Sequence, residues 1–126
     1  MSSSRRAKRP VPAAPAGRPG TYRLRWSRRA EVDLDAIDAY IAVDDPVAAA
    51  RWVEKLTERA RTAALVPFAG RAVPEFGMPH LREVFVRTYR IVYRIREHEV
   101  QVITVFEGHR LFPTDVDVDG DMEKDK

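Results

Sequence analysis

The sequence predicts a single α+β domain in which a helical hairpin packs on one face of a mainly antiparallel sheet, in the order β-α-α-β-β-β. Three observations support this fold class. Two stretches with apolar residues at helical spacing follow one another across a short acidic link at residues 44–46. Closely spaced apolar stretches between residues 81 and 106 are typical of an antiparallel meander. The length of 126 residues fits one domain.

The first predicted elements are a short strand and the helical hairpin. Residues 22–26 alternate apolar and basic side chains, which is typical of a strand. Ser27 is a candidate N-cap for the first helix, and Asp45 with Pro46 can start the second. The apolar positions that define the two helices are Ala30, Leu34, Ile37 and Ile41, and then Ala49, Trp52, Val53, Leu56, Ala60 and Ala63. Because the link is short, the helices should run antiparallel.

The predicted sheet has two chemically different faces. Strands are expected at residues 81–86, 89–95 and 99–106, with a polar turn at 96–98. The side chains expected to meet the helices are Tyr89, Ile91, Tyr93 and Ile95, and those expected on the helix-free face are Arg90, Val92 and Arg94. The strand at 22–26 must join the same sheet, because a lone strand would leave its backbone polar groups unpaired.

Arginines are expected to converge on the helix-free face or its rim. The further candidates are Arg82 in the strand 81–86, Arg71 and Arg87 in loops, Arg23 and Arg25 in the first strand, and His109 and Arg110 after the last. Such a cationic, partly apolar surface suits RNA phosphate, a DNA-bound enzyme or an acidic peptide. The alternative is an inert solvated face, where the polar residues of a half-buried sheet belong. In that case the acids available to pair with Arg82 are Glu75, Glu99 and Glu107.

The two ends of the chain differ in charge. Residues 1–20 carry five basic residues and no acidic one, and their Ser-, Pro- and Ala-rich composition predicts a disordered basic extension. This extension is either a weak polyanion-binding arm or a solvated segment. Residues 114–126 are acidic and are expected to form a disordered tail. The folded domain should therefore span residues 21–113.

Composition excludes several kinds of site. The chain has no cysteine, which rules out a disulfide framework, a thiolate metal site and a cysteine nucleophile. Asp115, Asp117 and Asp119 match the opening of a calcium loop, but Lys126 stands where that loop needs a glutamate. We therefore expect no metal and no cofactor. No run of about 18 apolar residues exists, so we expect no membrane span and a cytoplasmic location.

Six segments follow one another in an informative order. They are AEVDLDAIDAYI (30–41), DPVAAARWVEKL (45–56), LVPFAGRAVPE (65–75), LREVFV (81–86), YRIVYRI (89–95) and VFEGHRLFP (105–113). Together they resemble the RelE/ParE superfamily of type II toxin–antitoxin toxins, also called plasmid stabilisation proteins. The resemblance covers residues 22–113. It implies the compact RelE-like fold, in agreement with the pattern above, and a cognate antitoxin that wraps the toxin in a hetero-oligomer.

The resemblance leaves two activities open. RelE-type members are ribonucleases that cut mRNA on the ribosome, whereas ParE-type members poison DNA gyrase without catalysing a reaction. RNA cleavage requires a general base, a general acid and cations at the phosphate. Arg90 and Arg110 match two RelE-type arginines, and Arg82 could replace one strand lysine. The second lysine position falls near Val84, and the expected terminal tyrosine falls near Val116.

His109 is the remaining proton-transfer candidate, so His109 and Arg110 are catalytic only if the chain is a ribonuclease. Glu83 and Glu107 are either further acid/base candidates or arginine partners. The Leu-Arg-Glu strand start and the Gly-Arg loop favour the ParE side. We therefore expect a non-catalytic gyrase-directed toxin, with a ribosome-dependent ribonuclease and a non-toxic antitoxin-binding scaffold as alternatives.

Two sets of binding residues follow from these hypotheses. The candidates for binding the target or a phosphate are Arg71, Arg82, Arg90, Arg94 and Arg110. The candidates for binding the antitoxin are Trp52, Tyr40, Arg82 and Arg90. An acidic, amphipathic antitoxin segment would cover the arginine face and the helical hairpin.

Overall fold

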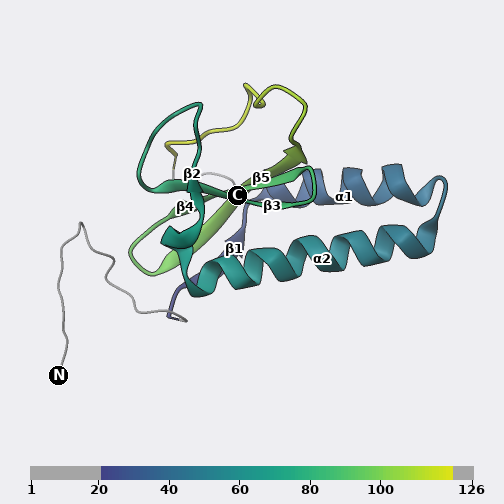
Figure 1. The fold of residues 1–126 in the computed structure, drawn as a ribbon, viewed down its shortest axis with the longest axis horizontal. Helices are drawn as coiled ribbons and strands as arrows, with labels where there is room; N and C mark the ends of the chain where they lie inside the picture. Colours follow the sequence, from purple (N-terminus) through teal and green to yellow (C-terminus); the bar gives the residue numbers. More distant parts are fainter. Residues whose placement is uncertain (1–20, 121–126) are drawn as a thin grey trace.

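In the computed structural model, which describes residues 21–120, two helices cover one face of a five-stranded sheet (Figure 1). The elements are β1 (Arg23–Trp26), α1 (Arg28–Ala42), α2 (Pro46–Leu65), the 3₁₀ turn η2 (Pro67–Ala69), β2 (Arg71–Ala72), β3 (Leu81–Val86), β4 (Tyr89–Ile95) and β5 (Glu99–Glu107). The predicted α+β class is confirmed, and the short strand β2 is an addition to it. The predicted extension 1–20 lies outside the described residues. Within the described part, neither helix combines the length and the hydropathy that a membrane span requires.

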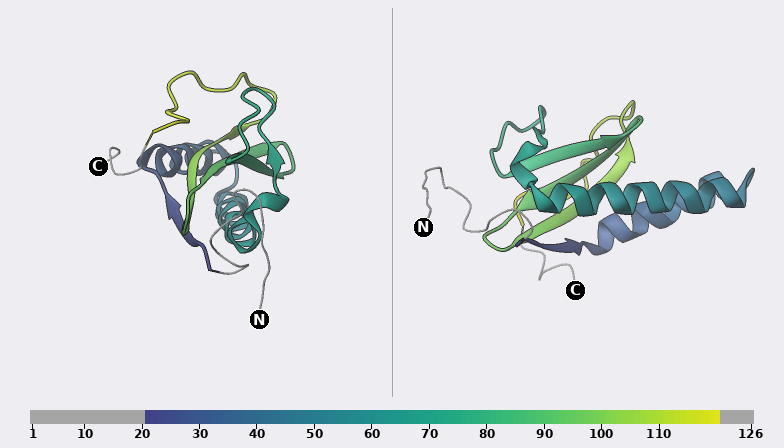
Figure 2. Two further views of the ribbon diagram at one scale, coloured as in Figure 1. Left: turned by 90° about the vertical axis from the view of Figure 1, so that its left-hand side faces the viewer. Right: turned by 60° about the horizontal axis from the view of Figure 1, so that its bottom comes forward.

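Both helices begin where the sequence predicts. The Ser27 hydroxyl accepts a hydrogen bond from the backbone N–H of Ala30 at 3.0 Å. The Asp45 carboxylate accepts one from the N–H of Ala48 at 3.0 Å, and Pro46 follows in the first turn of α2. Each cap thus satisfies an N–H group that a helix start leaves free. The hairpin is long enough for its tip to project past the end of the sheet (Figures 1 and 2).

The sheet order is β1-β5-β4-β3-β2, so the first strand pairs with the last. β1 runs parallel to β5, from Arg23 opposite Glu99 to Trp26 opposite Val102. This pairing confirms that the first strand joins the sheet. The strands β3, β4 and β5 form the predicted antiparallel meander.

The helix-facing side of the sheet carries the larger core. Leu56 and Ala60 of α2 cluster with Ile91 and Tyr93 of β4, and all four are buried. Fully burying a side chain such as Leu56 contributes about 1.5–3 kcal/mol. The residues predicted to meet the helices, Tyr89, Ile91, Tyr93 and Ile95, all pack in this cluster. The predicted orientation of β4 is therefore confirmed.

The helix-free face is covered by two segments of the chain. Its buried apolar residues are Val73, Leu81, Val92, Ile103 and Phe106. Met78 packs on them from the loop that follows β2, and Phe112, Val116 and Val118 pack on them from the chain that follows β5. The tail predicted to be disordered from residue 114 therefore lies against the sheet over residues 114–120. Its alternating aspartates and valines allow every second side chain to be buried.

Arg82 lies on the opposite face from the one we predicted. It is paired with Tyr93, and directly opposite residues of an antiparallel pair point to the same face. Val84 is likewise paired with Ile91 on the helix side. The register thus places Glu83, rather than Arg82, on the helix-free face. Because the second and third residues of this strand are both charged, its sequence does not reveal which of them faces the helices.

Strongly alkaline conditions should destabilise the fold through Tyr93. This side chain is fully buried, its hydroxyl donates to the carbonyl oxygen of Pro67 at 2.7 Å, and burial raises its pKa to about 12. The phenol of the unfolded chain ionises near pH 10. The contribution of protonated Tyr93 to the free energy of unfolding is therefore complete below pH 10 and falls by up to about 2–3 kcal/mol as pH rises toward 12. Denaturant titrations across this range, compared with Tyr93→Phe, measure the effect. If the free energy of unfolding changed equally with pH for the wild type and Tyr93→Phe, the prediction would be contradicted.

Candidate functional site

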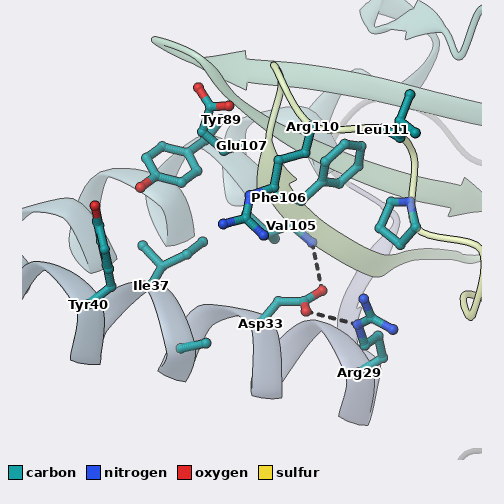
Figure 3. A pocket seen from close by; sticks show the side chains of 12 residues that line it. Arg29, Asp33, Ile37, Tyr40, Tyr89, Val105, Phe106, Glu107, Arg110 and Leu111 are labelled. Atoms are coloured by element: carbon teal, nitrogen blue, oxygen red, sulfur yellow. Dashed lines mark hydrogen bonds and ion pairs between the residues drawn. The ribbon is translucent and has the colours of Figure 1, made fainter.

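A groove lies between α1 and the second half of β5 (Figure 3). Its volume is about 1030 Å³. The charged and aromatic residues that line it are Arg29, Asp33, Tyr40, Tyr89, Phe106, Glu107 and Arg110, and the aliphatic ones include Ile37, Val105 and Leu111. These residues come from both sheet and hairpin, and the groove reaches the chain that follows β5.

The groove exists because β1 is shorter than β5. β1 ends at Trp26, opposite Val102, whereas β5 continues to Glu107. The outer edge of the second half of β5 therefore has no strand beside it. An open strand edge carries backbone groups that can pair with another chain.

Asp33 of α1 partly closes this edge. One carboxylate oxygen accepts hydrogen bonds from the Val105 N–H at 3.1 Å and from the Thr104 hydroxyl at 2.6 Å. The other oxygen accepts from Nε of Arg29 at 2.8 Å. Thr104 lies at an irregularity in the β4–β5 register, which turns its hydroxyl toward α1. Asp33 is not among the predicted site residues, because only the apolar positions of this helix were expected to face the sheet.

Tyr40, Arg110 and Leu111 form the exposed rim of the groove. Tyr40 is 78% exposed and Leu111 is 93% exposed. Arg110 is also exposed, and its guanidinium extends toward α1 (Figure 3). Within residues 21–120, that guanidinium has no ion pair or hydrogen-bond partner. A free cation beside exposed aromatic and aliphatic side chains is a typical anchor for a protein partner.

Tyr89 forms the inner aromatic wall between this groove and α2. Its ring lies edge-on to Trp52, with the ring centroids 5.4 Å apart. Burial and the nearby Glu107 and Tyr40 raise the pKa of the Tyr89 phenol, so the hydroxyl stays protonated and able to donate. Two antitoxin candidates, Tyr40 and Trp52, therefore lie around Tyr89, which was predicted only as a residue that meets the helices.

Arg90 is buried in an ion-pair cluster on the helix-free face and is not open to a ligand. Its Nε donates to Glu83 at 2.7 Å, and its two terminal nitrogens donate to Glu75 at 2.8 and 2.9 Å. The hydrogen bonds from Arg90 lower the pKa of Glu75, and those from Glu75 raise the pKa of Arg90. Arg90 also lies 5.0 Å from the ring of Phe106 and 5.6 Å from that of Phe112. The predicted open arginine surface is wrong at this position.

The remaining target-binding candidates are also engaged within the fold. Arg94 is 3% exposed and donates to Gln101 and to the carbonyl oxygen of Asp117. Arg71 donates to Glu83 at 2.8 Å. Arg82 donates to the carbonyl oxygens of Phe68, Gly70 and Pro79. The acids that could have paired with Arg82 on an inert face, Glu75, Glu99 and Glu107, do not do so within residues 21–120, where Arg82 donates to backbone carbonyl oxygens. The structure thus brings Arg71 and Arg90 together on Glu83, holds Arg82 and Arg94 elsewhere in the fold, and places Arg110, alone of the five candidates, in the groove.

His109 lies on an open turn after β5. Its side chain is 81% exposed, and Nδ1 lies 2.7 Å from a Glu107 carboxylate oxygen. The hydrogen bond from the His109 backbone N–H lowers the pKa of Glu107, which keeps this carboxylate charged. An acid–base pair is therefore present. Arg90, which the ribonuclease hypothesis places at the phosphate beside it, is buried against Glu83.

The chain matches the model of the family described as "ParE toxin of type II toxin-antitoxin system, parDE" over residues 24–112. This chain belongs to the ParE toxin family. A Sinorhizobium fredii (strain NBRC 101917 / NGR234) protein named "Putative toxin Y4kP" is 38% identical over 93 residues, which cover 72% of this ParE toxin and 93% of that protein. A solved structure described as "Chromosomal ParDE TA system from P. aeruginosa" has a TM-score of 0.59 and 26% identity, and covers 69% of this ParE toxin and 96% of that chain.

Membership of this family confirms the resemblance to the ParE side of the superfamily. The ParE toxin described here is the toxin component of a type II toxin–antitoxin module, and such a module implies an antitoxin partner.

Proposed function

We propose that this ParE toxin stops bacterial growth by binding DNA gyrase in the cytoplasm, without catalysing a reaction, and that a cognate antitoxin neutralises it. The observation that carries this proposal is the burial of Arg90 against Glu83 and Glu75. A ribonuclease of this superfamily would need that arginine at the scissile phosphate. Moving Arg90 there would break its ion pairs with Glu75 and with buried Glu83, which would keep Arg71. Breaking a buried ion pair costs on the order of 3–5 kcal/mol.

The proposed contact with gyrase is the rim of the α1–β5 groove. Arg110 supplies a cation that has no ion-pair partner among residues 21–120, and Leu111 supplies exposed apolar area beside it. Both residues follow the last strand closely, so the sheet fixes their positions. Large exposed side chains around an arginine are the features that dominate binding energy in protein interfaces.

The proposed contact with the antitoxin is the hairpin side of the same groove. Tyr40 is exposed there, and Trp52 stacks edge-on with Tyr89 a short distance away. An antitoxin segment seated on Tyr40 would also cover Arg110, and neutralisation would then follow from direct competition with gyrase. Arg82 and Arg90, our other antitoxin candidates, lie elsewhere in the fold and are bound internally.

The test is inducible expression of the full chain alone and together with the small acidic protein expected to be encoded beside it. Gyrase-linked DNA breaks and mRNA cleavage are measured in the same cells. DNA breaks with intact mRNA, suppressed by co-expression, are the expected result. Cleaved mRNA with intact DNA would establish the ribonuclease instead. Normal growth without either signal would leave an antitoxin-binding scaffold.

His109→Ala should leave toxicity unchanged within about twofold, because an exposed turn residue that transfers no proton contributes little. Growth inhibition and DNA breaks per unit of expressed protein measure this outcome. Loss of toxicity with a retained fold, assessed by circular dichroism, would make His109 a catalytic residue and would contradict the gyrase proposal.

A further inference from the structure

Residues 114–120, which we call the strap, lie across the helix-free side of the sheet. After β5 the chain crosses this side, away from α2, and ends its described course beside the β4–β5 turn (Figure 2). The family match ends at residue 112, so the strap lies beyond the part of the chain that the family shares. It is an addition laid over a sheet whose strands are already paired.

Three arginines hold the strap by polar contacts. Arg29 of α1 forms an ion pair with Asp115 at 2.7 Å. Arg94 of β4 donates to the carbonyl oxygen of Asp117 at 2.8 Å, and Arg96 donates to that of Gly120 at 2.9 Å. Two of these contacts are to the peptide backbone, so any extended chain could accept them.

Two valines of the strap supply its apolar contacts. Val116 and Val118 are half-buried and pack on the cluster that includes Val92, Ile103 and Phe106. They alternate with Asp115, Asp117 and Asp119, so aliphatic side chains face the sheet and acids face outward or toward the arginines. The surface beneath the strap therefore selects an extended peptide in which acidic and aliphatic residues alternate.

The strap is held more weakly than the strands below it. It forms no strand pairing with the sheet, and the side chain of Asp115 is 74% exposed. A segment with few buried apolar contacts and no backbone ladder opens locally without unfolding of the whole domain. Its release would uncover the apolar cluster and the guanidinium of Arg94.

We propose that the strap is a displaceable internal ligand, and that the surface beneath it binds an extended acidic and aliphatic peptide of a partner protein. The strap and the partner segment compete for the same site, so the strap lowers the apparent affinity of the toxin for the partner. A peptide suits this surface better than a nucleic acid, because the site combines two carbonyl-binding arginines with apolar positions for valine. This inference holds whichever enzyme the toxin inhibits.

Binding of the strap's own sequence in trans tests the proposal. The probe is a fluorescent synthetic peptide of residues 113–126. It is titrated into the full chain, into Val116→Asp/Val118→Asp, which releases the strap, and into Val43→Asp/Val47→Asp. The last variant makes the same change at two exposed positions, Val43 in the hairpin link and Val47 in the first turn of α2, and serves as the matched control.

The released variant should bind the probe at least about tenfold more tightly than the wild type or the control, because the tethered strap competes at a high effective concentration. A probe with serine in place of both valines should lose this binding. Equal affinities for all three proteins, or no binding to any of them, would overturn the proposal. Preference of the released variant for a DNA oligonucleotide over the peptide would also overturn it.

Hydrogen exchange on the wild-type chain provides a second measurement that needs no variant. Amides of residues 116–120 should exchange at least about tenfold faster than those of β4 and β5, through local opening. If the strap exchanged only together with the sheet, it would be a fixed part of the fold and not a displaceable ligand.

Discussion

Glu83→Ala should destabilise this ParE toxin by about 3–5 kcal/mol, because it removes the shared anion of a buried ion-pair cluster. The Glu83 side chain is fully buried and accepts hydrogen bonds from Arg90 on one oxygen and from Arg71 on the other. Its loss leaves Arg90, itself only 6% exposed, with Glu75 alone. Urea denaturation followed by circular dichroism measures the change.

Two further variants test whether the loss of stability in Glu83→Ala comes from the buried ion pair. Glu58→Ala removes an acid from an exposed ion pair with Arg61 and should cost no more than about 1 kcal/mol. The double variant Glu83→Leu/Arg90→Met replaces a buried charge pair by apolar side chains and should recover part of the loss. A cost below about 1 kcal/mol for Glu83→Ala would show that water or another anion reaches Arg90.

Arg110→Ala should weaken inhibition of gyrase supercoiling by at least about tenfold while leaving the stability within about 0.5 kcal/mol. The reason is that Arg110 is exposed in the groove and has no ion-pair partner within residues 21–120, so its truncation removes the proposed contact to gyrase and none within the described fold. Inhibition of purified gyrase by purified toxin, measured over a concentration series, gives the ratio.

The matched control for this experiment is Arg61→Ala, an exposed arginine on α2 that lies outside the groove. Arg61→Ala should retain full inhibition. Equal potency of Arg110→Ala and the wild type would remove the groove rim from the gyrase interface. It would leave the family assignment untouched, because that assignment rests on the whole of residues 24–112.

The helix starts and the strands could be predicted because their signals are local. Ser27 and Asp45 cap helices through hydrogen bonds within three residues, and the alternation in Tyr89–Ile95 assigns its own faces. The parallel pairing of β1 with β5 is a contact between distant segments, and no local pattern specifies its direction. The groove could not be predicted either, since it results from the different lengths of these two strands.

The site predictions failed where charge was taken as a sign of exposure. Arg90 and Arg94 were expected on an open face, but Glu75, Glu83 and the strap satisfy them internally. The strap was expected to be disordered because it is acidic. Its Val-Asp alternation is a strand-like period that could have indicated a packed segment. Arg110 was expected on the helix-free face or its rim together with the other arginines, but it is exposed in the groove between α1 and β5.

The insertion of β5 between β1 and β4 also constrains the order of folding during synthesis. The ribosome delivers β1 first and β5 last, so the strand that joins the two parts of the sheet is the final one to emerge. Until then the helical hairpin lacks the core residues that β5 supplies, such as Val100 and Val102, and closing the β1–β5 contact spans nearly the whole domain. We expect nascent chains that end before residue 99 to be digested rapidly by protease, and chains that extend past residue 107 to resist. A nascent toxin that lacks β5 should therefore be inactive, because the sheet that forms one wall of its groove is incomplete.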